Sequence, residues 1–316
     1  MKYVYLGNSG IKVSELCFGV LPIGPLQANL SVEEGGNLIL KGLHKGINFL
    51  DTAEVYKTYD YIKYALERFE GDVVVCSKSM ASDYKGMEKS ILDALKSLNR
   101  EYIDIFLLHA ARETPDVFEK REEALRCLLE YKQKGYIRAI GISTHSVKVV
   151  ERASKIPELD VVFPLINKAG RGVLQGSKND MLKAIKKCSQ AGQGLFAMKV
   201  LAGGNLVNDL IDAIEFSRNI EGIDAVAIGM VNEEELNLNL KIFNNEIIED
   251  KDLIKTVNTK KIFIYERHCQ KCGACIKTCP NHALSMGDNS AIIDHNKCIL
   301  CGYCSPVCEY FAIRML

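Results

Sequence analysis

Residues 72–108 read DVVVCSKSMASDYKGMEKSILDALKSLNREYIDIFLL. The apolar ends of this stretch, 72–76 and 103–108, have the length and the content of Val, Ile and Phe that are typical of buried strands. Between them, residues 86–98 place an apolar side chain at every third or fourth position, which predicts an amphipathic helix. Two strands joined by a helix usually pair in parallel, so the stretch predicts one βαβ unit.

The same alternation continues in both directions along the chain. Strands and helices that alternate strictly favour the α/β class, and eight such units over roughly 230 residues fit a closed (β/α)8 TIM barrel. A doubly wound open sheet is the alternative, but the Gly-x-Gly-x-x-Gly turn expected after its first strand is absent. The predicted strands are 17–20, 47–50, 72–76, 103–108, 139–142, 161–166, 195–198 and 225–228, after a hairpin of 3–6 and 13–16; the predicted helices are 32–45, 59–69, 86–98, 117–134, 146–154, 177–190, 208–217 and 233–244.

Eight of the twelve cysteines form two runs of equal spacing near the C-terminus. The spacing C-x2-C-x2-C-x3-C is that of a bacterial ferredoxin with two [4Fe–4S] clusters, in which the fourth cysteine of each run binds the other cluster. Structural zinc bound by four cysteines is the competing interpretation, and the repeated spacing favours iron and sulfur. The predicted ligands are Cys269, Cys272, Cys275 and Cys308 for one cluster, and Cys298, Cys301, Cys304 and Cys279 for the other.

A polar and charged stretch, 246–261, separates these cysteines from the predicted barrel and is taken as a linker. The predicted domains are therefore the barrel, 1–245, and a small ferredoxin-like α+β domain, 262–316. Pro280 follows the first cysteine run as the ferredoxin pattern expects, whereas Glu309 follows the second.

Composition narrows the classes of partner. Forty basic residues balance forty acidic residues among 316, so no overall field favours nucleic acid or an anionic membrane. No apolar run is long enough to span a bilayer and no signal peptide is recognisable, so we expect a cytoplasmic protein without a membrane span. Thiolate ligands for iron suit a reducing compartment and an anaerobic cell. Cys17, Cys76, Cys127 and Cys188 are expected to be packing or surface thiols, and His145 a surface residue.

Four polar side chains follow three neighbouring predicted strands. Asp51 and Tyr56 follow the second strand, Lys78 the third and His109 the fourth. In a barrel of this class the C-terminal ends of the strands form one mouth, so these side chains are expected to converge. A ketone that accepts hydride develops an alkoxide, which a positioned acid must protonate. Tyrosine, with a pKa near ~10 in water, becomes an effective acid when a neighbouring ammonium favours its anion.

The segments that carry these residues resemble the aldo-keto reductase family. The similar segments are LGNSGIKVS at 6–14, NFLDTAEVY at 48–56, CSK at 76–78, DIFLLH at 104–109 and GIS at 141–143. The resemblance covers roughly residues 1–245 and implies a catalytic tetrad of Asp51, Tyr56, Lys78 and His109. In this tetrad Lys78 would bring the pKa of Tyr56 toward neutrality, Asp51 would keep Lys78 charged, and His109 would orient the carbonyl group.

The resemblance also implies an extended nicotinamide dinucleotide across the barrel mouth, without a Rossmann domain. Met198 stands where many family members have a tyrosine that stacks on the nicotinamide. The acidic stretch 231–235 would repel a 2′-phosphate, so NAD(H) is expected in preference to NADP(H). Arg171 is expected to lie in a surface loop. The implied cofactor contacts are Ser143, Thr144, Asn167, Met198, Lys199, Gly203, Gly204, Gly229, Met230, Glu235 and Asn239.

Together these features predict an oxidoreductase. The barrel would carry out nicotinamide-linked redox chemistry on a small carbonyl or alcohol substrate, and the clusters would exchange single electrons with a redox partner protein such as a ferredoxin or flavodoxin. Hydride moves two electrons at once, so direct exchange with the clusters needs an intermediary such as a flavin, which no residue pattern supports. One alternative is an electron-transfer or docking subunit with a catalytically idle barrel. Another is that the clusters are purely structural.

Overall fold

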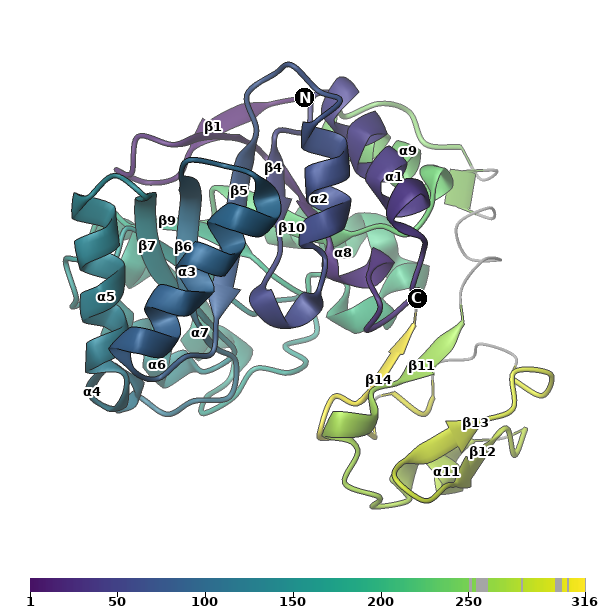
Figure 1. Ribbon diagram of the computed structural model, residues 1–316. Helices are drawn as coiled ribbons and strands as arrows, with labels where there is room; N and C mark the ends of the chain where they lie inside the picture. Colours follow the sequence, from purple (N-terminus) through teal and green to yellow (C-terminus); the bar gives the residue numbers. More distant parts are fainter. Residues whose placement is uncertain (250–251, 254–260, 280, 299–302, 306, 316) are drawn as a thin grey trace.

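The computed structural model describes residues 1–249, 252–253, 261–279, 281–298, 303–305 and 307–315, and its larger part is a closed parallel barrel (Figure 1). The strand order β10-β3-β4-β5-β6-β7-β8-β9 closes the sheet on itself, as the alternation of strands and helices predicted. The strands are β3 (Leu16–Gly19), β4 (Phe49–Asp51), β5 (Val74–Ser79), β6 (Ile103–Ala110), β7 (Ile137–Thr144), β8 (Val161–Pro164), β9 (Gly194–Ala197) and β10 (Ala225–Gly229).

Helices surround the barrel and bury their apolar faces against it. Side chains cap several of these helices: Ser31 forms a capping box with Glu34 at the start of α1, and Asp83 accepts a hydrogen bond from the Gly86 amide at the start of α3. The helices are α1 (Val32–His44), α2 (Tyr59–Leu66), α3 (Tyr84–Leu98), α4 (Val117–Lys120), α5 (Glu122–Gln133), α6 (Val147–Ala153), α7 (Lys178–Gln190), α8 (Leu210–Arg218) and α9 (Glu233–Phe243).

One predicted helix is wrong in its extent. The sequence predicted a single helix over 117–134, but α4 and α5 are separated at Arg121, whose φ of −121° and ψ of 27° are not helical. Arg121 is buried, and its guanidinium donates hydrogen bonds to the carbonyl oxygens of Ser79, Ala81 and His109. These bonds fix the ends of β5 and β6. They are tertiary contacts, which helix propensity calculated from the local sequence does not predict.

The N-terminal hairpin closes the bottom of the barrel. Strands β1 (Tyr3–Tyr5) and β2 (Lys12–Ser14) pair in antiparallel register, as predicted. The Gly7 amide donates to Asp224 and the Asn8 amide to Gly192, both of which precede barrel strands. Because this end is closed, a ligand can reach the barrel interior only from the C-terminal ends of the strands.

Apolar side chains fill the barrel interior. Phe163 and Phe196 stack with their ring centroids 3.7 Å apart, and Phe49 lies 4.9 Å from Phe196. Cys17 and Cys76 belong to the same interior cluster, and Cys127 and Cys188 pack between strands and helices, so all four thiols are buried as expected. This packed interior gives the polar side chains at the mouth a rigid base.

A smaller unit, here called the C-terminal module (residues 261–315 as described above), lies beside the barrel (Figure 1). Its elements are β11 (Ile262–Ile264), η5 (Glu266–His268), α11 (Ala274–Thr278), β12 (Leu284–Met286), β13 (Ala291–Ile293) and β14 (Ile313–Met315). Strand β11 pairs with β14, and β12 pairs with β13, both antiparallel. Most of the predicted linker, 246–261, lies outside the described residues, so its boundaries stay a prediction.

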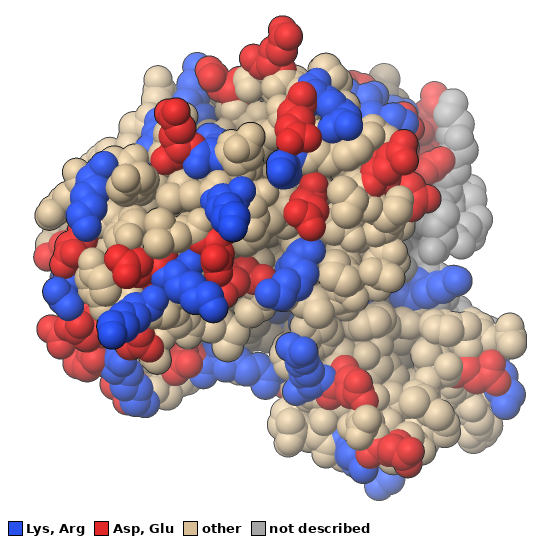
Figure 2. Space-filling view, viewed as in Figure 1, with Lys and Arg blue, Asp and Glu red and all other residues tan. Residues whose placement is uncertain are grey.

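The C-terminal module contacts loops at the barrel mouth. Arg112 donates a hydrogen bond to the carbonyl oxygen of Tyr310, and Val207 belongs to the apolar cluster of the module. Basic and acidic side chains are interspersed over the face shown in Figure 2, in keeping with the balanced composition. In the described part of the chain no helix has the length and apolarity needed to cross a membrane.

Candidate active site

The four predicted catalytic residues meet at the mouth of the barrel. Asp51 is the last residue of β4, and Lys78 and His109 are the next-to-last residues of β5 and β6. Tyr56 ends the short 3-10 helix η2 (Glu54–Tyr56), which follows β4. The sequence placed Lys78 and His109 just beyond their strands, and the strands in fact continue through them.

A buried ion pair lies at the centre of this group. Lys78 Nζ is 2.7 Å from Asp51 Oδ1 and donates a second hydrogen bond of 2.6 Å to the carbonyl oxygen of Thr52. Burial lowers the pKa of Lys78, but the charges of Asp51, Tyr56 and Cys76 and the hydrogen bond to Asp51 together outweigh it, so the net pKa is raised and the ammonium stays charged. Burial raises the pKa of Asp51 despite the opposing effect of Lys78. With Lys78 only 1% exposed, each partner depends on the other for its charge.

Tyr56 lies against this ion pair. Lys78 Nζ is 5.0 Å from the centre of the Tyr56 ring. Burial raises the pKa of Tyr56, and Lys78 lowers it by a smaller amount. The expectation that Lys78 brings this pKa toward neutrality therefore needs correction: the lysine acts in the expected direction, but the loss of hydration is larger, and the hydroxyl is fully protonated at neutral pH.

His109 faces Tyr56 edge to face, with the ring centroids 5.8 Å apart. Burial first, and then the positive charge of Lys78, lower the pKa of His109 to about 3. The imidazole is therefore neutral at physiological pH, and its buried Nδ1 atom has no hydrogen-bond partner among the described residues. A neutral imidazole at this place can exchange a hydrogen bond with a substrate oxygen without adding charge.

A cavity of about 160 Å³ opens above these groups. Asp51, Tyr56, Phe163 and Met198 form one side of it. A cavity of roughly 150 Å³ accommodates a benzene ring in other proteins, so this one suits a small molecule or one ring of a larger ligand. Two of the four predicted catalytic residues, Asp51 and Tyr56, thus border a space of substrate size.

The predicted nicotinamide contacts divide into two groups. Met198, Lys199, Gly203, Gly204, Gly229 and Glu235 line the cavity, whereas Ser143, Thr144, Asn167, Met230 and Asn239 do not. Ser143 Oγ and Asn239 Oδ1 are buried without a described partner, which suits groups that await a polar ligand. Asn167, in contrast, uses its side-chain amide within the 167–171 loop. Its Nδ2 donates to the Arg171 carbonyl oxygen, and its Oδ1 accepts from the Arg171 amide. Arg171 is half-buried there, as a loop residue.

Gly203 is covered by residues of the C-terminal module. Its φ of +66° favours glycine, and a Cβ atom at this position would lie 2.9 Å from Arg314 Cδ and 3.3 Å from the Phe311 ring. Six of the eleven implied nicotinamide contacts border this cavity, so the residues present suit one end of a dinucleotide. A phosphate group that approached Gly203 would meet the Arg314 side chain.

Sequence reasoning missed the contribution of the module to the mouth. Arg314 lines the cavity although it lies 205 residues beyond His109 in the chain, and it is 7% exposed. His145, expected at the surface, is also buried, and its Nε2 forms a hydrogen bond of 3.2 Å with Lys199 Nζ. Burial and the charge of Lys199 lower the pKa of His145 well below its usual value. A single arginine in a strand carries no sequence signal of such a role.

Four cysteine thiols gather in the module as the crossed ligand pattern predicts. Cys269, Cys272, Cys275 and Cys308 border one small hollow of about 20 Å³. Burial and the nearby Cys308, Cys269 and Cys272 raise the pKa of Cys275, so these four sulfur atoms are neighbours. Backbone amides of Ala291 and Ala312 donate to Cys269 Sγ and Cys308 Sγ, an arrangement that stabilises anionic sulfur. Cys301 of the second set lies outside the described residues.

These thiols suit a cluster better than one ion. Within the described ranges, no three His, Cys, Asp or Glu side chains group closely enough to hold a single metal ion. Four cysteine thiolates are the usual ligand set of a [4Fe–4S] cluster, and the four thiols around this apolar hollow supply that set.

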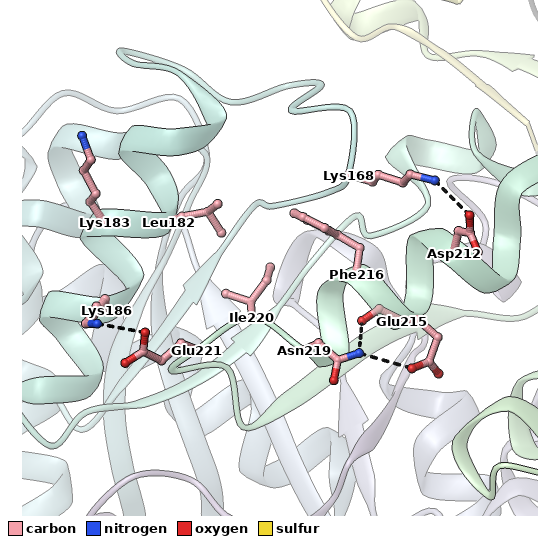
Figure 3. A pocket seen from close by; sticks show the side chains of 10 residues that line it. All are labelled: Lys168, Leu182, Lys183, Lys186, Asp212, Glu215, Phe216, Asn219, Ile220 and Glu221. Atoms are coloured by element: carbon pink, nitrogen blue, oxygen red, sulfur yellow. Dashed lines mark hydrogen bonds and ion pairs between the residues drawn. The ribbon is translucent and has the colours of Figure 1, made fainter.

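A separate surface groove of about 650 Å³ runs between α7 and α8 (Figure 3). It includes Leu182 and Phe216, and ion pairs of Lys168 with Asp212 and of Lys186 with Glu221 stand along it. None of the four predicted catalytic residues lines this groove, so the chemistry is assigned to the smaller cavity at the mouth.

The closed barrel with Asp, Tyr, Lys and His at one mouth is the arrangement that the sequence predicted for an oxidoreductase. A sequence model described as the aldo/keto reductase family matches residues 15–221, and one described as a 4Fe-4S dicluster domain matches residues 268–312. The chain therefore belongs to the aldo/keto reductase family and carries a region that matches a ferredoxin dicluster domain. That region implies two [4Fe–4S] clusters, and the family implies a nicotinamide cofactor.

Curated relatives are distant and partial. The chain is 26% identical to the methylglyoxal reductase DkgA of Escherichia coli over 190 residues, which are 57% of this chain and 67% of DkgA. It is 26% identical to the L-galactose dehydrogenase of Arabidopsis thaliana over 213 residues, or 64% of this chain and 66% of that protein. It is 25% identical to the aldo-keto reductase YhdN of Bacillus subtilis over 183 residues, or 53% of this chain and 54% of YhdN. The chain thus spans about half to two thirds of these proteins.

Solved structures agree on the fold. An aldo-keto reductase from Pseudomonas aeruginosa superposes with a TM-score of 0.68 at 23% identity, covering 77% of this chain and 95% of that chain. An aldo-keto reductase from Bacillus halodurans in its holo form superposes with a TM-score of 0.66 at 20% identity, covering 81% and 96%. At these identities the likeness shows the shared barrel alone.

Proposed function

We propose that this chain interconverts a small carbonyl compound and its alcohol with a bound nicotinamide dinucleotide, and that its two clusters exchange single electrons with a partner protein. The observation that carries the proposal is the buried Lys78–Asp51 pair against the Tyr56 ring, at the edge of a cavity of substrate size. Family membership and the dicluster region support it.

The tetrad would act by moving one proton while the hydride moves. A bound nicotinamide supplies the hydride to the carbonyl carbon, or accepts it in the reverse direction. The Tyr56 hydroxyl donates its proton to the carbonyl oxygen as negative charge builds there, and solvent then returns a proton to the tyrosinate. The Lys78 ammonium stabilises the tyrosinate in the meantime, and Asp51 keeps that ammonium in place. Neutral His109 orients the oxygen through a hydrogen bond.

Acidic side chains near the mouth favour NAD(H) over NADP(H). Glu233, Glu234 and Glu235 form the first turn of α9, directly after β10. Glu235 accepts a hydrogen bond from the Val231 amide, and Glu233 pairs with Lys41. A 2′-phosphate placed beside this turn would meet carboxylates and no unpaired cation of the turn itself, so the smaller charge of NAD(H) is proposed.

The clusters are proposed to serve a ferredoxin or flavodoxin as an external one-electron partner. Cys272 is exposed, so at least one edge of its predicted cluster would lie near solvent, where a partner protein can approach. The same exposure makes a cluster vulnerable to oxygen, so an anaerobic cytoplasm is the proposed setting.

The direct test compares Tyr56→Phe with the matched surface change Tyr102→Phe. Both remove one phenolic hydroxyl, and Tyr102 is 38% exposed and absent from the cavity. In protein reconstituted anaerobically with iron and sulfide, NADH-dependent reduction of a panel of small aldehydes and ketones is expected to fall at least about 100-fold in Tyr56→Phe and to persist in Tyr102→Phe. Undiminished turnover in Tyr56→Phe would refute the assignment.

A second candidate function is an electron-transfer subunit whose barrel does no chemistry. The covering of Gly203 by Arg314 and Phe311 favours it, because this cover restricts the path of a dinucleotide. It predicts no saturable binding of NADH or NADPH in calorimetry, together with reversible reduction of both clusters. Saturable binding of either dinucleotide decides against it.

A further inference from the structure

Arg314 is a buried cation with no counter-ion among the described residues. It extends from β14 of the C-terminal module, is 7% exposed, and has no carboxylate within ion-pair distance in the part of the chain that the structure describes. Its Nε atom lacks any hydrogen-bond partner there. Around it are aromatic faces: the guanidinium carbon lies 5.0 Å from the Phe311 ring centre and 5.7 Å from that of Tyr265.

A guanidinium in such a place is costly unless a ligand compensates it. Burial lowers the pKa of Arg314, yet an arginine keeps its proton in proteins and so keeps its charge. Aromatic rings offset part of the lost hydration through cation–π contacts, but they supply no hydrogen-bond acceptor. The planar fork of donors is suited to two parallel bonds with a carboxylate or phosphate.

The charge points into the predicted active site. Arg314 lines the same cavity as Asp51 and Tyr56, and Tyr56 is the titratable group that couples most strongly to its charge. Lys199 also lines this cavity. Burial first, and then the charges of Arg314 and Arg112, depress the pKa of Lys199 and so weaken its own positive charge. Neither Lys199 nor Arg112 forms an ion pair with any described carboxylate, so neither brings a counter-ion to Arg314.

We infer that Arg314 binds the anionic group of the substrate, so that the enzyme acts on small carbonyl compounds or alcohols that also carry a carboxylate. This inference rests on the proposed function and names its substrate class. The guanidinium would form a two-point contact with the carboxylate while Tyr56 and His109 engage the carbonyl oxygen of the same molecule. The cavity of about 160 Å³ limits that molecule to a size near that of benzoate. The C-terminal module thereby completes the substrate site of the barrel.

The pyrophosphate of a dinucleotide is the other oxyanion that could reach this guanidinium, because Arg314 Cδ also lies over Gly203. The position beside Tyr56 favours the substrate carboxylate, since the reacting oxygen must lie at the Tyr56 hydroxyl. Binding measurements with separate probes distinguish the two sources.

The test uses the full cluster-containing chain and titrates it with benzoate and with the uncharged benzamide by calorimetry. Wild-type protein is expected to bind benzoate at least about tenfold more tightly than benzamide, and Arg314→Gln is expected to lose this preference. Arg314→Lys keeps the positive charge and is expected to keep part of the preference for benzoate. Arg267→Gln, which changes an exposed arginine of the same module, is the matched control and is expected to behave as wild type.

Equal affinity for the two probes in wild type, or an unchanged preference in Arg314→Gln, would overturn the inference. An Arg314→Gln protein that loses affinity for NADH while keeping its benzoate preference would assign the residue to the dinucleotide phosphate and overturn it as well. If Arg314→Gln loses its clusters or its native circular dichroism spectrum, Arg314→Lys is compared with Arg267→Gln instead. A weaker preference for benzoate in Arg314→Lys supports the inference, and an equal preference overturns it.

Turnover separates this inference from the proposed function. Kinetics with pyruvate and with methyl pyruvate compare a charged and an uncharged substrate of similar shape, and Arg314→Gln is expected to raise KM for pyruvate at least about tenfold with little change for the ester. If wild type turns over neither compound but still prefers benzoate, the proposed function fails at these substrates and the anion site stands. If it reduces both equally well, the anion site fails and the proposed function stands.

Discussion

Arg112 of the barrel donates a hydrogen bond of 2.6 Å from Nη2 to the backbone carbonyl oxygen of Tyr310 in the C-terminal module. The next residue, Phe311, is buried and lies with its ring 5.2 Å from Lys199 Nζ at the barrel mouth. Three residues further along, Arg314 lines the cavity beside Tyr56. The barrel therefore contacts the module along the same short segment that supplies part of the cavity wall.

Removal of Lys78 is expected to destabilise the fold as well as to stop the chemistry. In Lys78→Met the carboxylate of Asp51 would stay buried without its partner, and the loss of one member of a buried pair costs about 3–5 kcal/mol. The free energy of unfolding in urea measures this. The control is Lys63→Met, whose exposed pair with Glu67 at 3.9 Å is worth about 1 kcal/mol or less. Similar losses in the two variants would contradict the account.

Acid is expected to destabilise the protein partly through His109. The pKa of His109 is lowered to about 3 in the fold, against about 6.5 in an unfolded chain. Between these values the unfolded chain binds a proton that the folded chain does not, so stability falls as pH falls through this window. From pH 7 to pH 5 this single group contributes a loss of about 1–2 kcal/mol.

The pH prediction is checked by urea unfolding of wild type, His109→Gln and the exposed control His44→Gln at pH 7 and pH 5. His109→Gln should lose less stability on acidification than wild type, and His44→Gln should follow wild type. An identical pH dependence in His109→Gln and wild type would show that this imidazole is charged in the fold.

Gly203 is expected to tolerate alanine less well than a glycine of similar conformation elsewhere. Gly203 and Gly135 have φ values of +66° and +83°, so alanine costs each about 1 kcal/mol of backbone strain. Only at Gly203 would the new Cβ meet Arg314 Cδ, at 2.9 Å, whereas nothing lies within 4 Å at Gly135.

We therefore expect Gly203→Ala to accelerate proteolytic separation of the module from the barrel, and Gly135→Ala to leave that rate unchanged. Limited proteolysis followed by mass spectrometry measures both rates. Equal rates in the two variants would mean that the contact between Gly203 and Arg314 does not hold the module.

Paired cysteine substitutions test the crossed cluster ligation. If Cys308 shares a cluster with Cys272, the double variant Cys272→Ala/Cys308→Ala should keep the other cluster and about half of the iron and sulfide. Cys272→Ala/Cys279→Ala should lose both clusters. Uncrossed ligation predicts the reverse result, and Cys188→Ala, which removes a buried barrel thiol, serves as the control with full iron content.

The barrel could be predicted because its signals are local and periodic. The alternation around 72–108 recurs in strands β5 and β6 and helix α3, within a few residues of the expected bounds. The extent of the helix predicted at 117–134 was wrong because the Arg121 guanidinium donates hydrogen bonds to carbonyl oxygens of β5 and β6. These are tertiary contacts, and the sequence around Arg121 does not indicate them.

The catalytic residues were predictable for a similar reason, since strand order brings Asp51, Lys78 and His109 to one mouth. Their electrostatics were less so. The net pKa shift of Tyr56 depends on how much water its neighbours exclude, and the spacing of residues does not report it. Arg314 could not be predicted at all, because its place at the mouth depends on how two separately folded units pack.

The strand that carries Arg314 lies a few residues after Cys308, a predicted cluster ligand. Cys308 Sγ accepts a hydrogen bond of 3.3 Å from the Ala312 amide, two residues before Arg314. If iron binds at Cys308 as predicted, the same sulfur atom would serve both a cluster and the backbone that leads to Arg314. The proposed anion site of the barrel is thus tied to the sulfur chemistry of the module by one short piece of chain.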